Sequence, residues 1–122
     1  MSPTPGAPVP IYVGGHTEAA LHRAARVGDG WTSAMMRLRD IRSTVDRLNV
    51  LREEYGRAGE PFEIQAVCID RVRPRGLPSA GDAGVTDAIV VPWVMEGVGF
   101  DGPVGKKLDS LRRFADTVIT KL

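Results

Sequence analysis

The pattern of apolar and polar residues begins with a short apolar run that ends in two glycines and leads at once into an amphipathic segment. The run covers residues 9–13, and Pro10 stands near its start, where a missing N–H group disturbs a strand least. In residues 17–27 the apolar positions recur at helical spacing: Ala20, Leu21, Ala24, Ala25 and Val27. Thr17 can cap the start of this helix, and Glu18 in the first turn interacts favourably with the helix dipole. Gly28 follows the last apolar position, where a glycine in the left-handed conformation ends many helices. The pattern therefore predicts a strand followed by a helix.

A second strand–helix unit follows, and then the clearest strand of the chain. A strand is expected at 31–34 and a helix at 40–55, with an apolar stripe of Ile41, Val45, Leu48, Leu51 and Tyr55. Residues 62–70 alternate, which places Ile64, Ala66 and Cys68 on one face and Gln65, Val67 and Ile69 on the other.

The last part of the chain predicts a nearly apolar strand at 87–93 and a helix at 103–121. The apolar stripe of this helix is Val104, Leu108, Leu111, Ala115, Val118 and Leu122. The connection 71–86 holds two prolines and three glycines, and has room for at most one helical turn, at 79–83. Apolar strands that alternate with helices favour an α/β fold with a parallel sheet. We expect residues 1–8 to be a flexible tail and 9–122 to form one domain.

Composition and charge narrow the function classes. The net charge of the 122 residues is +1, and no basic patch stands apart from acidic residues, so neither a nucleic acid nor a membrane is an expected partner. No segment approaches the roughly 20 apolar residues that cross a bilayer. One cysteine, Cys68, forms no internal disulfide, and together these features favour a cytoplasmic protein. Metal-ligand spacing is absent, and no metal is expected.

The turn formed by Gly14, Gly15, His16 and Thr17 is the main candidate site. Glycines let a ligand approach the backbone, and amides at a helix start favour a phosphate. The alternative is a tight turn that needs glycine only for its dihedral angles. The spacing does not fit the G-x-G-x-x-G pattern of dinucleotide-binding proteins.

Other candidates have simpler interpretations. His16 is a possible donor to a phosphate or a polar turn residue, and His22 is expected to be solvated. Trp31 and Trp93, both placed on strands, could flank a ring system but are expected in the core. Cys68 is expected to be a buried hydrophobe without a histidine or carboxylate partner. Four arginines are expected on a solvated helix face: Arg37, Arg39, Arg42 and Arg47.

The stretch PIYVGGHTEAALHRAARVGDGW, residues 10–31, resembles the luciferase-like monooxygenase superfamily of flavin- and F420-dependent oxidoreductases. The later elements follow in the order of that family. The resemblance implies a (β/α)8 TIM-type barrel, with FMN or F420 as cofactor and Gly14–Thr17 near the cofactor phosphate. A whole barrel needs about 250 residues, and this chain resembles the C-terminal half, with about four parallel strands and helices on one face. The connection 71–86 is shorter than in the family.

Half a barrel has an uncovered inner face and two open sheet edges. We expect the inner face to be apolar, so that the chain forms a homo-oligomer or binds a complementary N-terminal half. Three functions remain open: the cofactor-phosphate half of an oxidoreductase or monooxygenase, a non-catalytic oligomeric remnant of the family, and a piece of an ordinary enzyme whose first half lies upstream. No catalytic acid or base can be assigned from the sequence.

Overall fold

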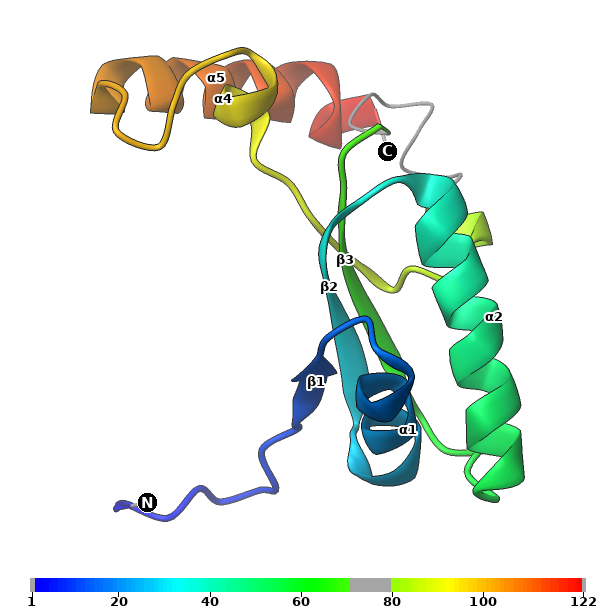
Figure 1. Ribbon diagram of the computed structural model, residues 1–122. Helices are drawn as coiled ribbons and strands as arrows, with labels where there is room; N and C mark the ends of the chain where they lie inside the picture. The colour runs from blue at the N-terminus through cyan, green and yellow to red at the C-terminus, as the bar shows by residue number, and fades with distance from the viewer. Residues whose placement is uncertain (1, 71–79, 122) are drawn as a thin grey trace.

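The computed structural model describes residues 2–70 and 80–121, and its centre is a four-stranded, all-parallel sheet (Figure 1). The strands lie in the order β1 (Tyr12–Gly14), β2 (Gly30–Met36), β3 (Glu63–Cys68) and β4 (Asp87–Ile89). The helices are α1 (Glu18–Val27), α2 (Leu38–Glu54), α4 (Pro92–Met95), α5 (Val104–Thr117) and the short 3-10 helix η1 (Ile119–Lys121). The predicted α/β half-barrel class is confirmed.

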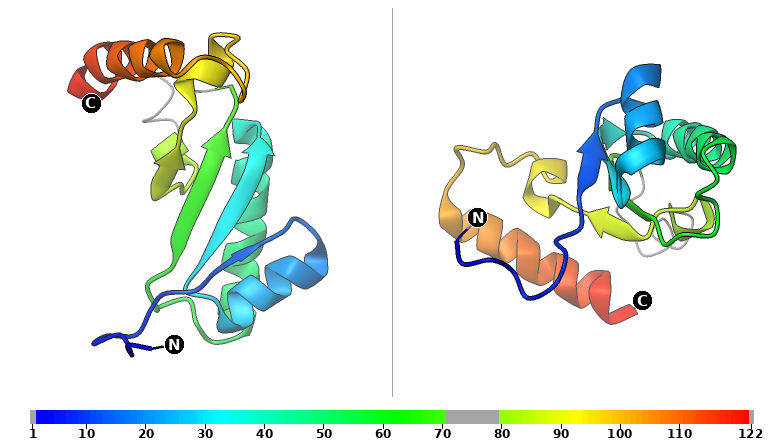
Figure 2. Two further views of the ribbon diagram at one scale, coloured as in Figure 1. Left: turned by 90° about the vertical axis from the view of Figure 1, so that its left-hand side faces the viewer. Right: turned by 90° about the horizontal axis from the view of Figure 1, so that it is seen from below.

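Helices α1 and α2 cover one face of the sheet, and the main core lies between them and the strands (Figures 1 and 2). The alternation predicted for β3 is confirmed, because Ile64, Ala66 and Cys68 are buried under the helices. Trp31 of β2 is fully buried in the same core. The helical turn expected near 79–83 is present in its described part, where Ala80 and Ala83 join the core. The predicted connection at 71–79 lies outside the described residues.

Two predicted strands are shorter than expected. Residues 9–11 lie outside the sheet, because Ile11 is bonded through both of its backbone groups to Asp29: its amide donates to the carboxylate and its carbonyl accepts from the amide of Asp29. The fourth strand ends at Ile89 rather than at residue 93. Pro92 has no N–H donor to continue the sheet and starts helix α4 instead.

The uncovered face of the sheet has a polar centre, so the expectation of an apolar inner face is wrong there. Strand register places Thr32, Gln65 and Asp87 side by side on β2, β3 and β4. The hydroxyl of Thr32 donates to Gln65 Oε1 at 3.1 Å, and Gln65 Nε2 donates to Asp87 Oδ2 at 2.8 Å. These three residues, which we call the polar row, offer hydrogen-bonding groups rather than apolar surface to whatever covers this face.

Helix α5 lies beyond the carboxyl ends of the strands and extends away from α1 and α2 (Figures 1 and 2). It packs on α4, and Arg113 of α5 forms an ion pair of 2.6 Å with Glu96. The predicted apolar stripe of α5 is only partly buried. Val118 is buried, but three residues of the stripe are exposed: Val104, Leu108 and Leu111. Among the described helices, none is long and apolar enough to cross a membrane.

Two arginines that the sequence pattern did not single out hold the segment between α2 and β3 in place. Arg57 donates to the carbonyl oxygens of Ala25 and Gly28 at 2.8 and 2.9 Å, at the end of α1. Arg52 is buried, and its guanidinium lies 4.5 Å from the ring centre of Phe62. The left-handed conformation predicted for Gly28 is wrong: its φ is −82°, and glycine is needed because a Cβ would lie 2.9 Å from the carbonyl oxygen of Ala24.

Candidate functional site

The turn between β1 and α1 lies at the carboxyl end of β1, beside the middle of the longer strand β2 (Figure 1). Strand β1 ends at Gly14, and α1 begins at Glu18. Thr17 is the N-cap, as predicted, and its hydroxyl oxygen accepts a hydrogen bond of 3.2 Å from the amide of Ala20. The structure thus brings the four predicted site residues together in one connection at the start of a ten-residue helix.

The two glycines of this turn differ in whether the backbone requires glycine at their positions. Gly15 has a φ of +112°, and a Cβ there would lie 2.8 Å from the Cβ of Ala20. Gly14 has no such requirement, since its nearest contact would be an ordinary one of 3.6 Å with Thr32 Cγ2. The dihedral-angle interpretation therefore accounts for Gly15 but leaves Gly14 unexplained. What Gly14 does is leave the backbone at the end of β1 uncovered.

The first amides of α1 are available to a ligand. The amide of Ala20 is capped by Thr17, whereas those of Thr17, Glu18 and Ala19 have no hydrogen-bond partner among the described residues. Unpartnered N–H groups at a helix N-terminus, with the positive end of the helix dipole, suit a phosphate group. Gly14 is exposed beside them, so the turn has the backbone chemistry of an anion site.

Two side chains hold the turn against β2. The indole Nε1 of the buried Trp31 donates to the carbonyl oxygen of Gly15 at 2.8 Å. The backbone amide of Ala34 donates to Nε2 of His16 at 3.2 Å. The rings of His16 and Trp31 are 5.5 Å apart and nearly perpendicular. The interpretation of Trp31 as a core residue is confirmed, but no local pattern indicates that its indole also holds Gly15.

An irregularity in β2 makes the Ala34 contact possible. The register with β3 shifts between Thr32 and Met35, so the amide of Ala34 turns away from the regular ladder. The hydroxyl of Ser33 accepts the amide of Val67 at the same place, at 2.9 Å. The run of residues 31–34 alone carries no signal of this bulge.

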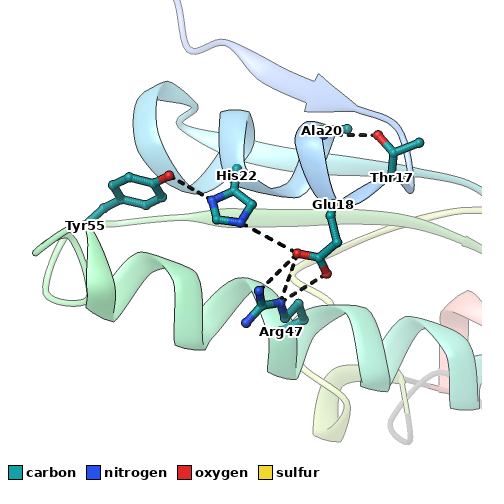
Figure 3. A network of polar contacts seen from close by, with 6 residues as sticks. All are labelled: Thr17, Glu18, Ala20, His22, Arg47 and Tyr55. Carbon is teal, nitrogen blue, oxygen red and sulfur yellow. Dashed lines mark hydrogen bonds and ion pairs between the residues drawn. The ribbon is translucent and has the colours of Figure 1, made fainter.

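A polar network on α1 and α2 engages the acidic residue beside the turn (Figure 3). Glu18 forms a bidentate contact with Arg47, whose closest N···O distance is 3.0 Å. The Arg47 hydrogen bond lowers the pKa of Glu18, and Glu18 in turn raises the pKa of Arg47. His22 Nδ1 lies 2.8 Å from the Tyr55 hydroxyl, and its Nε2 lies 3.7 Å from Glu18. Neutralisation by Arg47 reduces the repulsion that Glu18 would exert on a phosphate at the same helix start.

The remaining candidates lie away from the turn. Trp93 is on helix α4 rather than on the predicted strand, and it is half-buried. Cys68 is buried as expected, but the expectation that it has no carboxylate partner is wrong, because its sulfur lies 3.1 Å from Asp70 Oδ1.

His22 is hydrogen-bonded to Tyr55 rather than only solvated, although its side chain remains 41% exposed. Arg37, Arg39 and Arg42 are exposed as expected, whereas Arg47 is engaged by Glu18. In the described ranges no three His, Cys, Asp or Glu side chains are grouped as metal ligands.

Comparison with known proteins agrees with the fold. The sequence profile of the luciferase-like monooxygenase family matches residues 1–69, which include β1 to β3 and the turn. Uncharacterized proteins of Mycobacterium bovis and of two strains of Mycobacterium tuberculosis are 41% identical to this chain over 126 aligned positions. The match covers all of this chain and 42% of the length of each relative.

The family match covers more than half of the chain and includes three of the four parallel strands, β1 to β3. The profile and the architecture agree that this chain belongs to the luciferase-like monooxygenase family.

Proposed function

We propose that this chain is the C-terminal, cofactor-phosphate half of a flavin- or F420-dependent luciferase-like oxidoreductase or monooxygenase. The observation that carries the proposal is the turn at residues 14–17. There the unpartnered amides of Thr17, Glu18 and Ala19 stand next to the uncovered backbone of Gly14. Family membership supplies the cofactor class.

In this proposal the chain binds and orients the cofactor, which itself supplies hydride transfer or oxygen insertion when bound. The amides at the start of α1 hold the phosphate, and Trp31 fixes the turn by its hydrogen bond to Gly15. Arg47 draws the carboxylate of Glu18 toward α2, so that the phosphate does not meet an unpaired negative charge.

The rest of the barrel is supplied by other residues. The chain spans 42% of the length of its curated relatives, and strands β1 and β4 are the edges of the sheet. We propose that a complementary N-terminal half, on the same or another polypeptide, closes the barrel and forms the ring pocket. Gln65 gives the carboxylate of Asp87 a neutral donor. We expect a segment that buries this carboxylate to add a positively charged group or a further donor opposite it, because burial of an incompletely compensated charge is strongly destabilising.

The alternative is a non-catalytic oligomer that keeps the packing of the family without its chemistry. One observation favours it: α5 exposes Leu108 and Leu111, an apolar surface that a second copy could cover. Under this alternative neither cofactor binds.

Fluorescence titration with FMN and F420 tests the proposal, with riboflavin, which has no phosphate, as the matched control ligand. The titration is run on the chain alone and after addition of the segment of the Mycobacterium tuberculosis relative that this chain lacks. We expect micromolar binding of FMN or F420 and at least tenfold weaker binding of riboflavin. Absence of binding under both conditions would contradict the proposal and support the non-catalytic oligomer.

A further inference from the structure

His16 accepts a hydrogen bond that determines which ring nitrogen of the neutral side chain carries the proton. The backbone amide of Ala34 lies 3.2 Å from Nε2 of His16. A backbone amide can only donate, so Nε2 must present its lone pair. A neutral imidazole has one proton, and it must then be on Nδ1.

We propose that His16 is a positioning residue, fixed as the neutral Nδ1–H tautomer, that donates from Nδ1 to a phosphate or carbonyl oxygen of the cofactor held on the turn. The identity of the ligand rests on the proposed function above, whereas the tautomer rests on the Ala34 contact alone. Nδ1 has no hydrogen-bond partner in the described part of the chain, and the residue is exposed at the turn. His16 thereby adds a fixed donor to the amides of Thr17, Glu18 and Ala19.

The orientation of the ring is determined from two sides. The edge contact with Trp31 sets the plane of the ring, and the Ala34 amide determines which nitrogen faces β2. Trp31 is fully buried and also bonded to Gly15, so it gives His16 a rigid support. Two fixed contacts leave little rotamer entropy to lose when a ligand binds.

His22, the other histidine of the chain, has the opposite arrangement and serves as an internal control. The Tyr55 hydroxyl lies 2.8 Å from its Nδ1, while its Nε2 faces the Glu18 carboxylate at 3.7 Å (Figure 3). The carboxylate is too far away for a hydrogen bond, but its negative charge favours a proton on the nearer Nε2 of neutral His22, and Tyr55 then donates to Nδ1. The two histidines are therefore expected to be opposite tautomers.

Long-range 1H–15N correlation spectra of the 15N-histidine-labelled chain test the tautomer directly. The spectra are recorded near pH 8.5, above the ordinary histidine pKa of about 6.5, and are assigned with the His22→Gln variant. We expect the Nδ1–H pattern for His16 and the Nε2–H pattern for His22. An Nε2–H or averaged pattern for His16 would overturn the proposal, whether or not any cofactor binds.

Two substitutions separate the donor function of His16 Nδ1 from the contact of Nε2 with the Ala34 amide, which supports the turn. Glutamine places its amide near the position of Nε2, and asparagine places its amide near that of Nδ1. His16→Gln should keep the Ala34 contact and the melting temperature but weaken FMN or F420 binding about five- to tenfold, the loss of one hydrogen bond. His16→Asn should keep most of the affinity and lower the melting temperature. Equal affinities of His16→Gln and wild type, or no phosphate-dependent binding by any variant, would overturn the donor role.

Discussion

The indole Nε1 of Trp31 donates a hydrogen bond of 2.8 Å to the carbonyl oxygen of Gly15. This contact joins a fully buried core residue to the turn that carries the candidate phosphate site. The shape of the turn therefore depends on how well the core under β2 is packed, and we expect this pair to couple stability to the binding proposed for the turn.

Replacement of Trp31 by phenylalanine tests this coupling. The variant leaves the Gly15 carbonyl without its donor and a space beside the ring, and should lower the free energy of unfolding by about 1–3 kcal/mol. Urea denaturation followed by circular dichroism measures the loss. Trp93→Phe is the matched control, since the indole N–H of Trp93 has no partner among the described residues, and it should change stability less. Equal losses in the two variants would show that the Gly15 bond contributes nothing.

Alanine at Gly14 and at Gly15 should have different effects. Gly15→Ala forces a positive φ on a residue with a Cβ that meets Ala20, and should cost about 1–3 kcal/mol of stability. Gly14→Ala makes only an ordinary contact, so it should keep the melting temperature and weaken phosphate-dependent cofactor binding. Thermal melts and cofactor titrations of both variants make the comparison. If Gly14→Ala binds the cofactor like wild type, the uncovered backbone has no role in binding.

The contact between Glu18 and Arg47 should make stability depend on pH. The folded pKa of Glu18 is lowered by its hydrogen bond to Arg47, so its contribution is present above the unfolded pKa and is lost as the pH falls through the folded pKa. Glu18→Gln should therefore lower the melting temperature at pH 7 and have little effect at acidic pH below the folded value. Because the pair is exposed, 0.5 M NaCl should reduce the difference in melting temperature between Glu18→Gln and wild type. A difference that stays constant from neutral to acidic pH would assign the effect of Glu18 to something other than its charge.

Helix α5 should cause self-association of the isolated chain. Leu108 and Leu111 are 45% and 41% exposed, and both belong to the apolar stripe of α5. Light scattering at tens of micromolar should show an oligomer, which the Leu108→Asn/Leu111→Asn variant shifts toward monomer. Val27→Asn, on the exposed side of α1, is the control and should leave the oligomer unchanged. A wild-type chain that remains monomeric at these concentrations would refute both the apolar-surface argument and the oligomeric alternative.

The sequence pattern was most informative where one local rule determines the structure. The alternation in β3 correctly separated Ile64 and Ala66 from Gln65, because a strand buried on one face repeats every two residues. Thr17 capped α1 as expected, because a hydroxyl before a helical run satisfies its first amides.

Features that depend on pairing between distant segments could not be predicted from local pattern. The polar row joins Thr32 to Gln65 and Asp87, which lie 33 and 55 positions further along the chain. Only strand register brings these residues together. The contact between Ala34 and His16 depends on a bulge in β2 that no local signal marks. Strand β4 ends early because Pro92 begins a helix, although residues 87–93 have an apolar pattern that suits a longer strand.

Backbone amide spectra of the 15N-labelled chain, titrated with FMN, F420 and riboflavin, test the central claim most directly. If the turn binds the cofactor phosphate, the amides of Thr17, Glu18 and Ala19 should shift saturably with FMN or F420 and stay in place with riboflavin. Equal shifts with riboflavin, or no shift at these amides while the cofactor binds elsewhere, would contradict a phosphate site at the start of α1.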